Sequence, residues 1–178
     1  MNIRALKPKE SSAVERLFTS VFTASEGDAE GALIGNLARE LMAQTDRRDL
    51  FGFVAVDREH IVGAIFFSRL TVAAEIDLFL LAPVAVHEEY QGMGVGQALI
   101  THGLEKLTEN GVDIVVTYGD PAFYSKVGFQ SLSTETIPPP FDLSQPDGWL
   151  GQSLTEAPLA PLPGPCSCVA AFDDPAYW

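Results

Sequence analysis

The chain has 178 residues, 47 % of them hydrophobic and 20 % charged, which suits one globular domain and leaves no apolar run long enough to cross a bilayer. Eleven Lys and Arg stand against 24 Asp and Glu, and the net charge of −13 opposes binding to a nucleic-acid backbone. The charged start MNIRALKPKE lacks the apolar stretch of a secretion signal, so we expect a cytoplasmic protein that engages neither membrane nor nucleic acid.

The first third of the chain predicts a short strand followed by two helices. The strand is expected at Asn2–Leu6. Apolar residues then recur at helical spacing over residues 10–22, which predicts a helix with one buried face. A second amphipathic helix is predicted over 28–42, since acidic residues gather where its N-terminus carries positive partial charge.

Three strands are predicted next. The runs 51–57 and 61–72 are rich in β-forming residues, and the polar Arg58–His60 between them indicates a hairpin. The run 76–86 is almost entirely apolar, which is typical of a strand covered on both faces. Pro83 lies inside this run and has no N–H to donate, which indicates a bulge or an opened strand pair.

The middle of the chain predicts alternating helices and strands. A helix follows the glycines at 92–96 and ends at Asn110-Gly111, because glycine accepts the left-handed backbone of a helix C-terminus. A buried strand at 113–118, a short helical segment at 121–126 and a last strand from Gly128 follow. The order β-α-α-β-β-β-α-β-α-β predicts an α/β (α+β) fold, a mixed sheet flanked by helices on both faces.

The composition changes near the end of the chain. Nine of the 12 prolines lie in the last 41 residues, so we expect no regular structure from Pro138 onward, apart from an edge strand at Ser167–Phe172. This region is nevertheless too apolar for a free tail. We therefore divide the chain into a domain at 1–145 and a proline-rich extension at 146–178 that packs on the domain.

The two cysteines are predicted to be reduced thiols. Cys166 and Cys168 are too close in sequence for an unstrained disulfide, and a metal site requires further ligands. His60, His87 and His102 are scattered along the chain and supply none in a recognisable pattern. We expect no metal.

The most informative segment runs from Val84 to Gln97, from a strand through a polar turn into glycines that open a helix. Glycine lets the backbone approach a ligand closely, and the first amides of a helix have no internal partner, so they can bind a diphosphate. A dinucleotide-binding G-x-G-x-x-G motif requires a third glycine, but that position is Gln97 when counted from Gly92 and Leu99 when counted from Gly94. A P-loop requires a lysine that this segment lacks. A glycine-rich connection without a ligand remains the alternative.

The hexapeptide QGMGVG resembles the Q/R-x-x-G-x-G/A signature of the GNAT N-acetyltransferase superfamily through Gln91, Gly94 and Gly96. Residues 124–129, YSKVGF, are similar to the Y-x-x-x-G-F element of the same family. The resemblance covers residues 1–137. It implies the GNAT acyl-CoA acyltransferase fold with a splayed central sheet, and direct acetyl transfer from acetyl-CoA, as co-substrate, to an amine.

The resemblance also implies roles for individual residues. Tyr124 is expected to be the general acid that protonates the leaving thiolate, although an aromatic that only closes the rim of the core is the alternative. Backbone groups of Val84, Ala85 and Val86 are expected to pair with the pantetheine arm. The remaining residues expected to contact the cofactor are Gln91, Gly92, Met93, Gly94, Val95, Gly96, Gln97, Asp120 and Lys126.

The general base is not identified by the sequence. The position that aligns with the glutamate of some family members is Ala82, and a water relay is an alternative. Other acids that come into question, each also explicable as a surface or helix-start charge, are Glu26, Asp28, Glu30, Glu75 and Asp77. His87, in the turn before Gln91, is interpreted as structural.

Two other functions compete with acetyl transfer. The protein could use a longer acyl-CoA, or it could be a regulatory module that binds acyl-CoA without catalysis. The acceptor is expected to be a small-molecule or peptide amine, and the protein a monomer or a homodimer.

Overall fold

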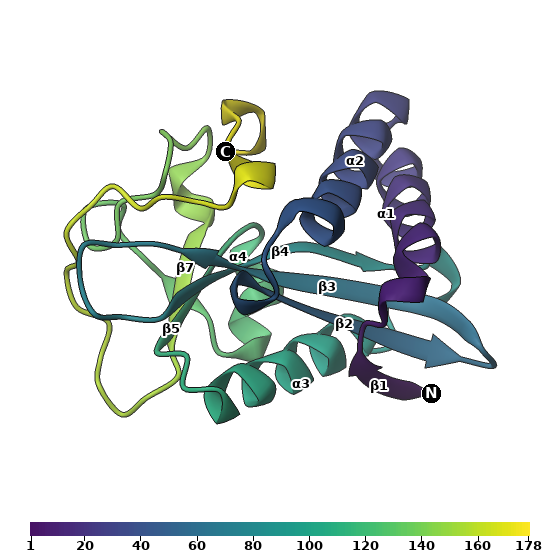
Figure 1. Cartoon of the computed structure of the whole chain (residues 1–178), viewed down its shortest axis with the longest axis horizontal. Coiled ribbons are helices and arrows are strands. Elements are labelled where there is room, and N and C mark those ends of the chain that lie inside the picture. Colours follow the sequence, from purple (N-terminus) through teal and green to yellow (C-terminus); the bar gives the residue numbers. More distant parts are fainter. The chain divides into compact units, whose positions relative to one another are not determined.

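The computed structural model describes residues 1–178, and its seven strands form one sheet in the order β1-β2-β3-β4-β5-β7-β6 (Figure 1). The chain divides into two compact units, one of residues 1–66 with 83–103 and the other of residues 67–82 with 104–178. Strands β3 and β4 each belong partly to both units, which are described in turn below. No helix combines the length and the apolar character needed to span a membrane.

The element order agrees with the predicted one, with one additional strand. The strands are β1 (Asn2–Ala5), β2 (Leu50–Asp57), β3 (His60–Leu70), β4 (Leu78–Val86), β5 (Ile114–Tyr118), β6 (Gln130–Ser131) and β7 (Trp149–Ser153). The α-helices are α1 (Ser11–Glu26), α2 (Asp28–Gln44), α3 (Val95–Glu109) and α4 (Pro121–Tyr124). Short 3-10 turns, among them Pro8–Glu10, Arg47–Asp49, Glu88–Tyr90 and Ser125–Val127, connect several of them.

In the first unit, β1 and β2 pair antiparallel from Asn2 opposite Val56 onward, and β2 and β3 form the predicted hairpin. Its two loop residues, Arg58 and Glu59, have φ angles of 48° and 69°. Left-handed backbone at both central positions is what a two-residue hairpin loop requires to match the twist of its strands. The hairpin prediction is confirmed, although neither loop residue is the usual glycine or asparagine.

Helices α1 and α2 form a closely packed hairpin that turns at Gly27, whose φ is +98° (Figure 1). Gly31 and Gly35 lie one turn apart on α2, against Thr23 and Thr19 of α1, and a methyl group at either glycine would overlap the facing threonine. The small residues let the two helix backbones approach each other. Both helix predictions are confirmed, and each helix extends beyond its predicted end.

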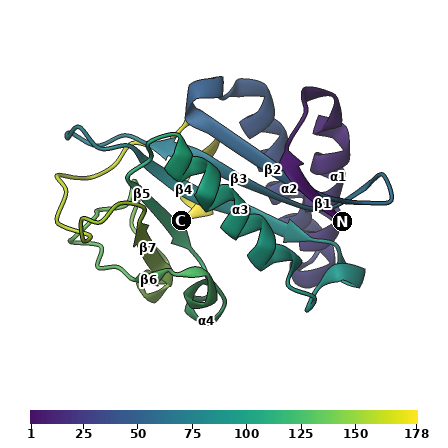
Figure 2. The ribbon, with the colours of Figure 1, turned by 90° about the horizontal axis from the view of Figure 1, so that it is seen from below.

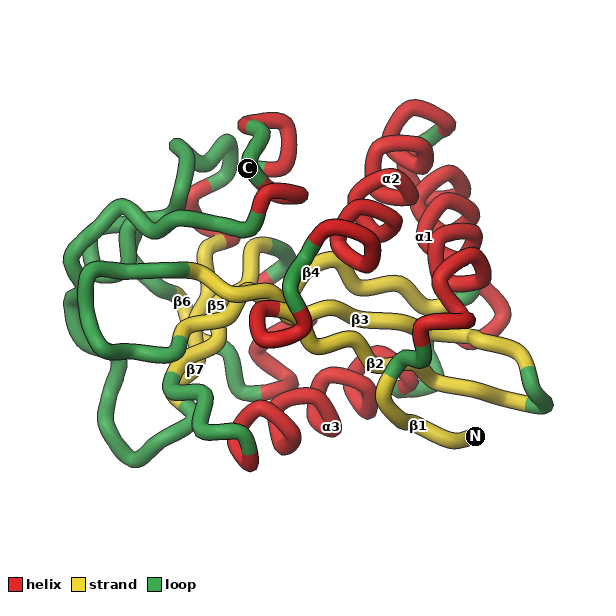
Figure 3. Tube along the Cα trace, viewed as in Figure 1, coloured by secondary structure: helices red, strands yellow, loops and turns green.

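The two faces of β3 are covered by different helices, as Figure 3 shows for α1 and α3. The ring of Phe66 lies 5.8 Å, centroid to centroid, from that of Phe18 on α1. Gly63 faces α3 instead, because a Cβ there would lie 2.8 Å from Leu99 Cδ1. Side chains alternate between the faces of a strand, so residues three apart point in opposite directions. Helices on both faces of the sheet are therefore confirmed.

In the second unit, β4 pairs parallel with β5, and β7 pairs antiparallel with both β5 and β6 (Figure 2). Strand β7 comes from the region in which we predicted no regular structure, and that prediction is wrong for residues 149–153. The prolines of this region surround the WLGQS stretch but do not enter it, and Trp149 and Leu150 are buried. The predicted division after residue 145 would separate this strand from the partners with which it pairs.

The remainder of the C-terminal segment is fixed by buried aromatic side chains. Trp149 and Trp178 lie 6.3 Å apart, edge to face, and the indole N–H groups donate to the carbonyl oxygens of Ile137 and Phe172, at 2.9 and 3.0 Å. Burying an indole in this way requires a partner for its N–H, and both have one. These contacts tie Trp149 and Trp178 to neighbouring segments of the chain.

The predicted edge strand at Ser167–Phe172 is wrong. Ser167 forms one isolated bridge with Thr71, through two backbone hydrogen bonds of 2.8 Å, and residues Ala170–Phe172 form a 3-10 turn. Pro165, two residues before the bridge, has no N–H, so the ladder cannot continue in that direction.

Candidate functional site

The site predicted from the glycine loop begins where β4 ends, in the first unit. Pro83 and Ala85 are buried there, whereas Val84 and Val86 are half-buried. The His87 amide donates to the Val62 carbonyl at 2.8 Å and is the last link of this segment to β3. The chain then leaves the sheet.

The turn after β4 is held by three side chains. His87 Nδ1 accepts a hydrogen bond from the Glu89 amide at 3.2 Å, which caps the 3-10 turn and confirms the structural role predicted for this histidine. Tyr90 donates from its hydroxyl to an Asp57 carboxylate oxygen at 2.8 Å, an interaction that raises the pKa of the phenol. Gln91 donates from Nε2 to the Val86 carbonyl at 2.9 Å, so both ends of the turn are fixed.

The glycines that follow adopt conformations that other residues avoid. Gly92 and Gly94 have φ angles of +74° and +81°, and no atom lies within 4 Å of the position that a Cβ would take at either. The Met93 side chain between them is 69 % exposed, which is unusual for a large apolar residue. Helix α3 begins immediately afterwards with Val95, and Gly96 is buried in its first turn.

Six consecutive backbone amides of this segment have no hydrogen-bond partner. The first hydrogen bond of α3 runs from the Ala98 amide to the Gly94 carbonyl, at 3.0 Å, and none of the amides from Gly92 to Gln97 donates a hydrogen bond. Free amides at the start of a 15-residue helix carry the positive end of its dipole. Such a set of donors suits a diphosphate, in a chain whose net charge would otherwise repel one.

A second group of predicted residues lies in the other unit, at the end of β5. The parallel pairing of β4 with β5 stops at Leu81 opposite Thr117. There the Thr117 hydroxyl, fully buried, donates to the Leu81 carbonyl at 2.8 Å. A side chain thus satisfies the carbonyl at the point where the ladder ends, two residues before Pro83, whose missing N–H prevents its continuation.

Tyr124 lies close to Thr117 in this unit. Its ring packs edge to face against Phe123 and Phe129, at centroid distances of 5.0 and 5.8 Å. The ring also lies over Gly119, where a Cβ would come within 2.7 Å of Tyr124 Cε2, so a larger residue at that position would displace the ring.

The surroundings of Tyr124 keep its phenol protonated. Burial raises the pKa of the hydroxyl above its ordinary value, the neighbouring Thr117 hydroxyl lowers it, and the charge of Asp120 raises it. The net shift of the pKa is upward. At neutral pH the group is therefore a proton donor, not a phenolate.

The other two predicted cofactor contacts of this unit differ in how they are engaged. An Asp120 carboxylate oxygen accepts from the Ala122 amide at 2.9 Å and caps α4, which accounts for an acid at this position without a ligand. Lys126 is exposed and forms no ion pair. It is free to meet an anion.

None of the acids considered as the general base is set apart by its surroundings. Asp77 forms an ion pair with Arg69, at 2.7 Å, just before the first residue of β4. Glu26 ends α1, and Asp28 and Glu30 lie in the first turn of α2, where negative charge stabilises the helix. No group of three or more His, Cys, Asp or Glu side chains is placed to hold a metal ion.

Known proteins resemble this chain in sequence and in structure. The family model of the acetyltransferase (GNAT) domain matches residues 48–131. The uncharacterized N-acetyltransferase YhbS of Escherichia coli K12 is 37 % identical over 135 residues, which are 73 % of this chain and 74 % of that protein.

Solved structures extend the likeness over almost the whole chain. The crystal structure of Escherichia coli YhbS in complex with CoA has a TM-score of 0.80 and 28 % identity, and covers 97 % of this chain and 92 % of that one. A GNAT family acetyltransferase from Brucella melitensis in complex with acetyl-CoA has a TM-score of 0.76 and 25 % identity, with 97 % of each chain covered.

Fold and loop together define an acyltransferase that takes its acyl group from a coenzyme A thioester. The chain belongs to the GNAT acetyltransferase family. It has the mixed-sheet fold of that family and, like its named relatives, is an N-acetyltransferase; the two solved structures that it resembles hold CoA and acetyl-CoA.

Two residues of the site were not anticipated from the sequence. The Thr117 hydroxyl donates to the Leu81 carbonyl, at the point where the pairing of β4 with β5 ends. Gly119 has no side chain and so leaves space for the Tyr124 ring. A glycine between a strand and the Asp120-Pro121 helix start was a signal for close packing, whereas nothing in the sequence marked Thr117.

Proposed function

We propose that this N-acetyltransferase binds the diphosphate of acetyl-CoA with the six free amides from Gly92 to Gln97 and uses Tyr124 as the general acid. The single observation that carries the proposal is that row of amides, which make no hydrogen bond within the protein. Every helix start leaves its first amides without an internal partner, and here the loop before α3 adds further free amides to them, a row of donors that suits an anion.

The other proposed cofactor contacts are supported by the positions of their backbone or side chains. Val84, Ala85 and Val86 lead directly into the loop, and their backbone groups are proposed to pair with the pantetheine arm as an added strand would. Gln91 holds the loop entry through Val86, and Lys126 is a proposed phosphate contact. Asp120 is the weakest member of the set, because its carboxylate already caps α4.

The chemistry is a direct transfer. The neutral amine attacks the thioester carbonyl, the new N–C bond forms and the C–S bond breaks. The nitrogen loses one proton and the departing thiolate gains one, which Tyr124 supplies from its hydroxyl. A phenol is protonated at neutral pH, and burial raises the pKa of this hydroxyl further. The base that accepts the amine proton is not assigned.

The acceptor is proposed to be a small-molecule or peptide amine, a group that is cationic before it loses its proton. The net charge of −13 attracts such a substrate and repels nucleic acid. The proposed location is the cytoplasm, where the two free thiols, Cys166 and Cys168, would stay reduced.

The test combines coenzyme A titration with a transfer assay on a panel of primary amines and peptides. We expect Tyr124→Phe to bind coenzyme A as the parent does and to lose about 10²–10⁴-fold in kcat, the contribution typical of general acid catalysis. Tyr118→Phe is the matched control, because that hydroxyl is hydrogen-bonded to Ser144 and to the Gln145 amide. It should leave kcat unchanged.

Three outcomes would contradict the proposal. Unimpaired turnover by Tyr124→Phe would remove the tyrosine from the mechanism. A parent protein that binds coenzyme A tightly yet acetylates none of the amines would favour a regulatory module, and faster transfer from a longer acyl-CoA would change the donor.

A further inference from the structure

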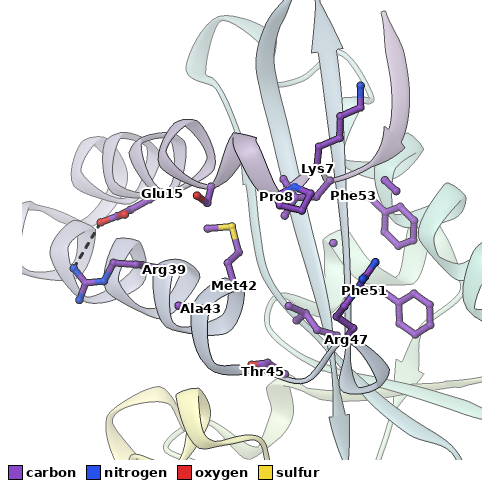
Figure 4. A pocket seen from close by; sticks show the side chains of 15 residues that line it. Lys7, Pro8, Glu15, Arg39, Met42, Ala43, Thr45, Arg47, Phe51 and Phe53 are labelled. Atoms are coloured by element: carbon purple, nitrogen blue, oxygen red, sulfur yellow. Dashed lines mark ion pairs between the residues drawn. The ribbon is translucent and has the colours of Figure 1, made fainter.

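A second concave site lies in the first unit. A cavity of about 520 Å³ opens between the ends of α1 and α2 on one side and β1 and β2 on the other (Figure 4). Its walls come from the turn after β1, the start of α1, the end of α2 and the first residues of β2. The volume falls within the range of roughly 300–1,000 Å³ that is typical of small-molecule sites.

The cavity is separate from the glycine loop. Leu50, the first residue of β2, lines the cavity, whereas Asp57, the last residue, accepts the hydrogen bond from Tyr90 beside the loop. A strand of this length spans about 23 Å, at roughly 3.3 Å per residue. No residue of the loop or of α3 lines the cavity.

One wall of the cavity is apolar and incompletely covered. Leu6, Met42, Leu50 and Phe51 all contribute to it, and all four are only half-buried. Met42 is a flexible, polarisable side chain that adapts to apolar ligands, and it extends from α2 toward the cavity (Figure 4). Neighbouring apolar side chains that share an open hollow favour an apolar ligand body.

The rim is positively charged although the protein is strongly acidic. Three of the 11 Lys and Arg residues, Lys7, Arg39 and Arg47, line this one cavity, with Glu15 as the only acid. Glu15 lies 3.9 Å from Arg39, which also donates to Asn36. The ammonium of Lys7 and the guanidinium of Arg47 form no ion pair. The cavity therefore has two positive charges without an ion-pair partner beside an apolar wall, and of the two Lys7 also attracts the Glu10 carboxylate at longer range.

We propose that this cavity binds a small amphipathic carboxylate, with an aromatic or branched aliphatic body against the Met42 wall and its carboxylate on Arg47. A guanidinium offers a carboxylate two parallel hydrogen bonds, whereas Lys7, at the opposite end of the cavity in Figure 4, adds positive potential at longer range. The ligand class combines the two properties that the lining residues supply together, apolar surface and unpaired positive charge.

The probes are 2-naphthoate and its uncharged counterpart 2-naphthamide, each titrated into the full chain by calorimetry. We expect the acid to bind about tenfold more tightly than the amide, since one good charge-assisted contact contributes roughly that factor. Arg47→Gln should remove the tenfold preference, Lys7→Gln should reduce it by about threefold at low salt, and Met42→Trp should fill the cavity and abolish binding of both probes.

Arg48→Gln is the matched control. Arg48 is next in sequence, carries the same charge, pairs with Asp46 and does not line the cavity, so its substitution should leave both affinities unchanged. Saturating coenzyme A should also leave them unchanged. Thermal unfolding of each variant verifies that the exposed substitutions preserve the fold.

Several results would overturn the proposal. They are the absence of binding, equal affinity for acid and amide, an equal loss in Arg48→Gln, and competition with coenzyme A, which would place the probe at the glycine loop. Self-association of the chain that blocks the probe would assign the apolar wall to a second copy instead. None of these results bears on acetyl transfer itself, so the two proposals fail independently.

Discussion

Replacing Gly94 with alanine tests whether the shape of the glycine loop serves a ligand. Its φ of +81° is unfavourable for any residue with a Cβ, and the space around the missing Cβ is empty, so the substitution adds backbone strain without a clash. Gly111, after the end of α3, has a φ of +79° and equally open surroundings. Gly111→Ala is therefore a control with the same local cost.

The magnitude follows from what holds each glycine in place. Alanine at a left-handed φ costs about 1–2 kcal/mol, of which roughly 0.4–1 kcal/mol is returned by the smaller entropy of the unfolded chain. The Gly111 amide donates to the Thr108 carbonyl at 3.1 Å, so this position cannot relax. Gly111→Ala should lose about 1 kcal/mol of stability, or about 2–4 °C in Tm for a domain of this size.

In Gly94→Ala we expect the same strain energy to reduce coenzyme A affinity more than folding stability. The amides around Gly94 make no internal hydrogen bonds, so the loop of the free protein can relax to a negative φ and avoid much of the strain. Binding of a diphosphate would restore the original turn and with it the strain. We expect a small change in Tm and a loss of coenzyme A affinity of about five- to tenfold, the equivalent of roughly 1–1.4 kcal/mol.

The assay is calorimetric titration of both variants with coenzyme A, together with thermal unfolding in its absence. The reasoning is refuted if Gly94→Ala binds coenzyme A as tightly as the parent protein. It is equally refuted if Gly111→Ala loses as much affinity, because the effect would then reflect general destabilisation.

Three further predictions concern other parts of the chain. Gly35→Ala places a methyl group on Thr19 and should cost about 1–3 kcal/mol in urea unfolding; an unchanged midpoint would mean that the helices separate freely. The hydrogen bonds from Arg4 lower the pKa of the Glu10 carboxyl. This pair therefore stabilises the fold fully when the pH is above the ordinary pKa of a glutamate, and its contribution is lost as the pH falls through the lowered pKa. Arg4→Gln should therefore flatten the decline of Tm with acid, and a parallel decline would argue against it. Burial raises the pKa of Cys166 to about 11, so iodoacetamide at pH 8 should modify this thiol only after unfolding, as mass spectrometry can follow; rapid modification of the native protein would contradict its burial.

The sequence predicted the first unit better than the second because its signals are local. Helical periodicity marks α1 and α2, and the polar turn marks the β2–β3 hairpin. Strand β7 has only five residues in a proline-rich region. Its place between β5 and β6 depends on pairing with β5 residues more than 30 positions away and with β6 residues about 20 positions away. Pairing over such a distance leaves no periodic pattern in a single sequence.

The same distinction applies to the candidate site. The loop could be predicted because its glycines, the preceding strand and the following helix are consecutive, and their free amides follow from that order alone. The contacts of Thr117 with Leu81, and of Gly119 with the Tyr124 ring, depend on how separate segments meet. The sequence does not distinguish a threonine whose hydroxyl ends a strand pairing, such as Thr117, from any other threonine in a strand.

The position of β7 also has a consequence for the order in which the chain is synthesised. Until Trp149–Ser153 leave the ribosome, β5 presents the unpaired backbone of Ile114–Tyr118, an apolar and uncharged edge, for more than 30 residues of elongation. Nascent chains paused in that interval can pair with one another instead of with their own later segment. Expression conditions that slow translation just before residue 149 should therefore favour inclusion bodies, and added chaperone should matter most at that stage.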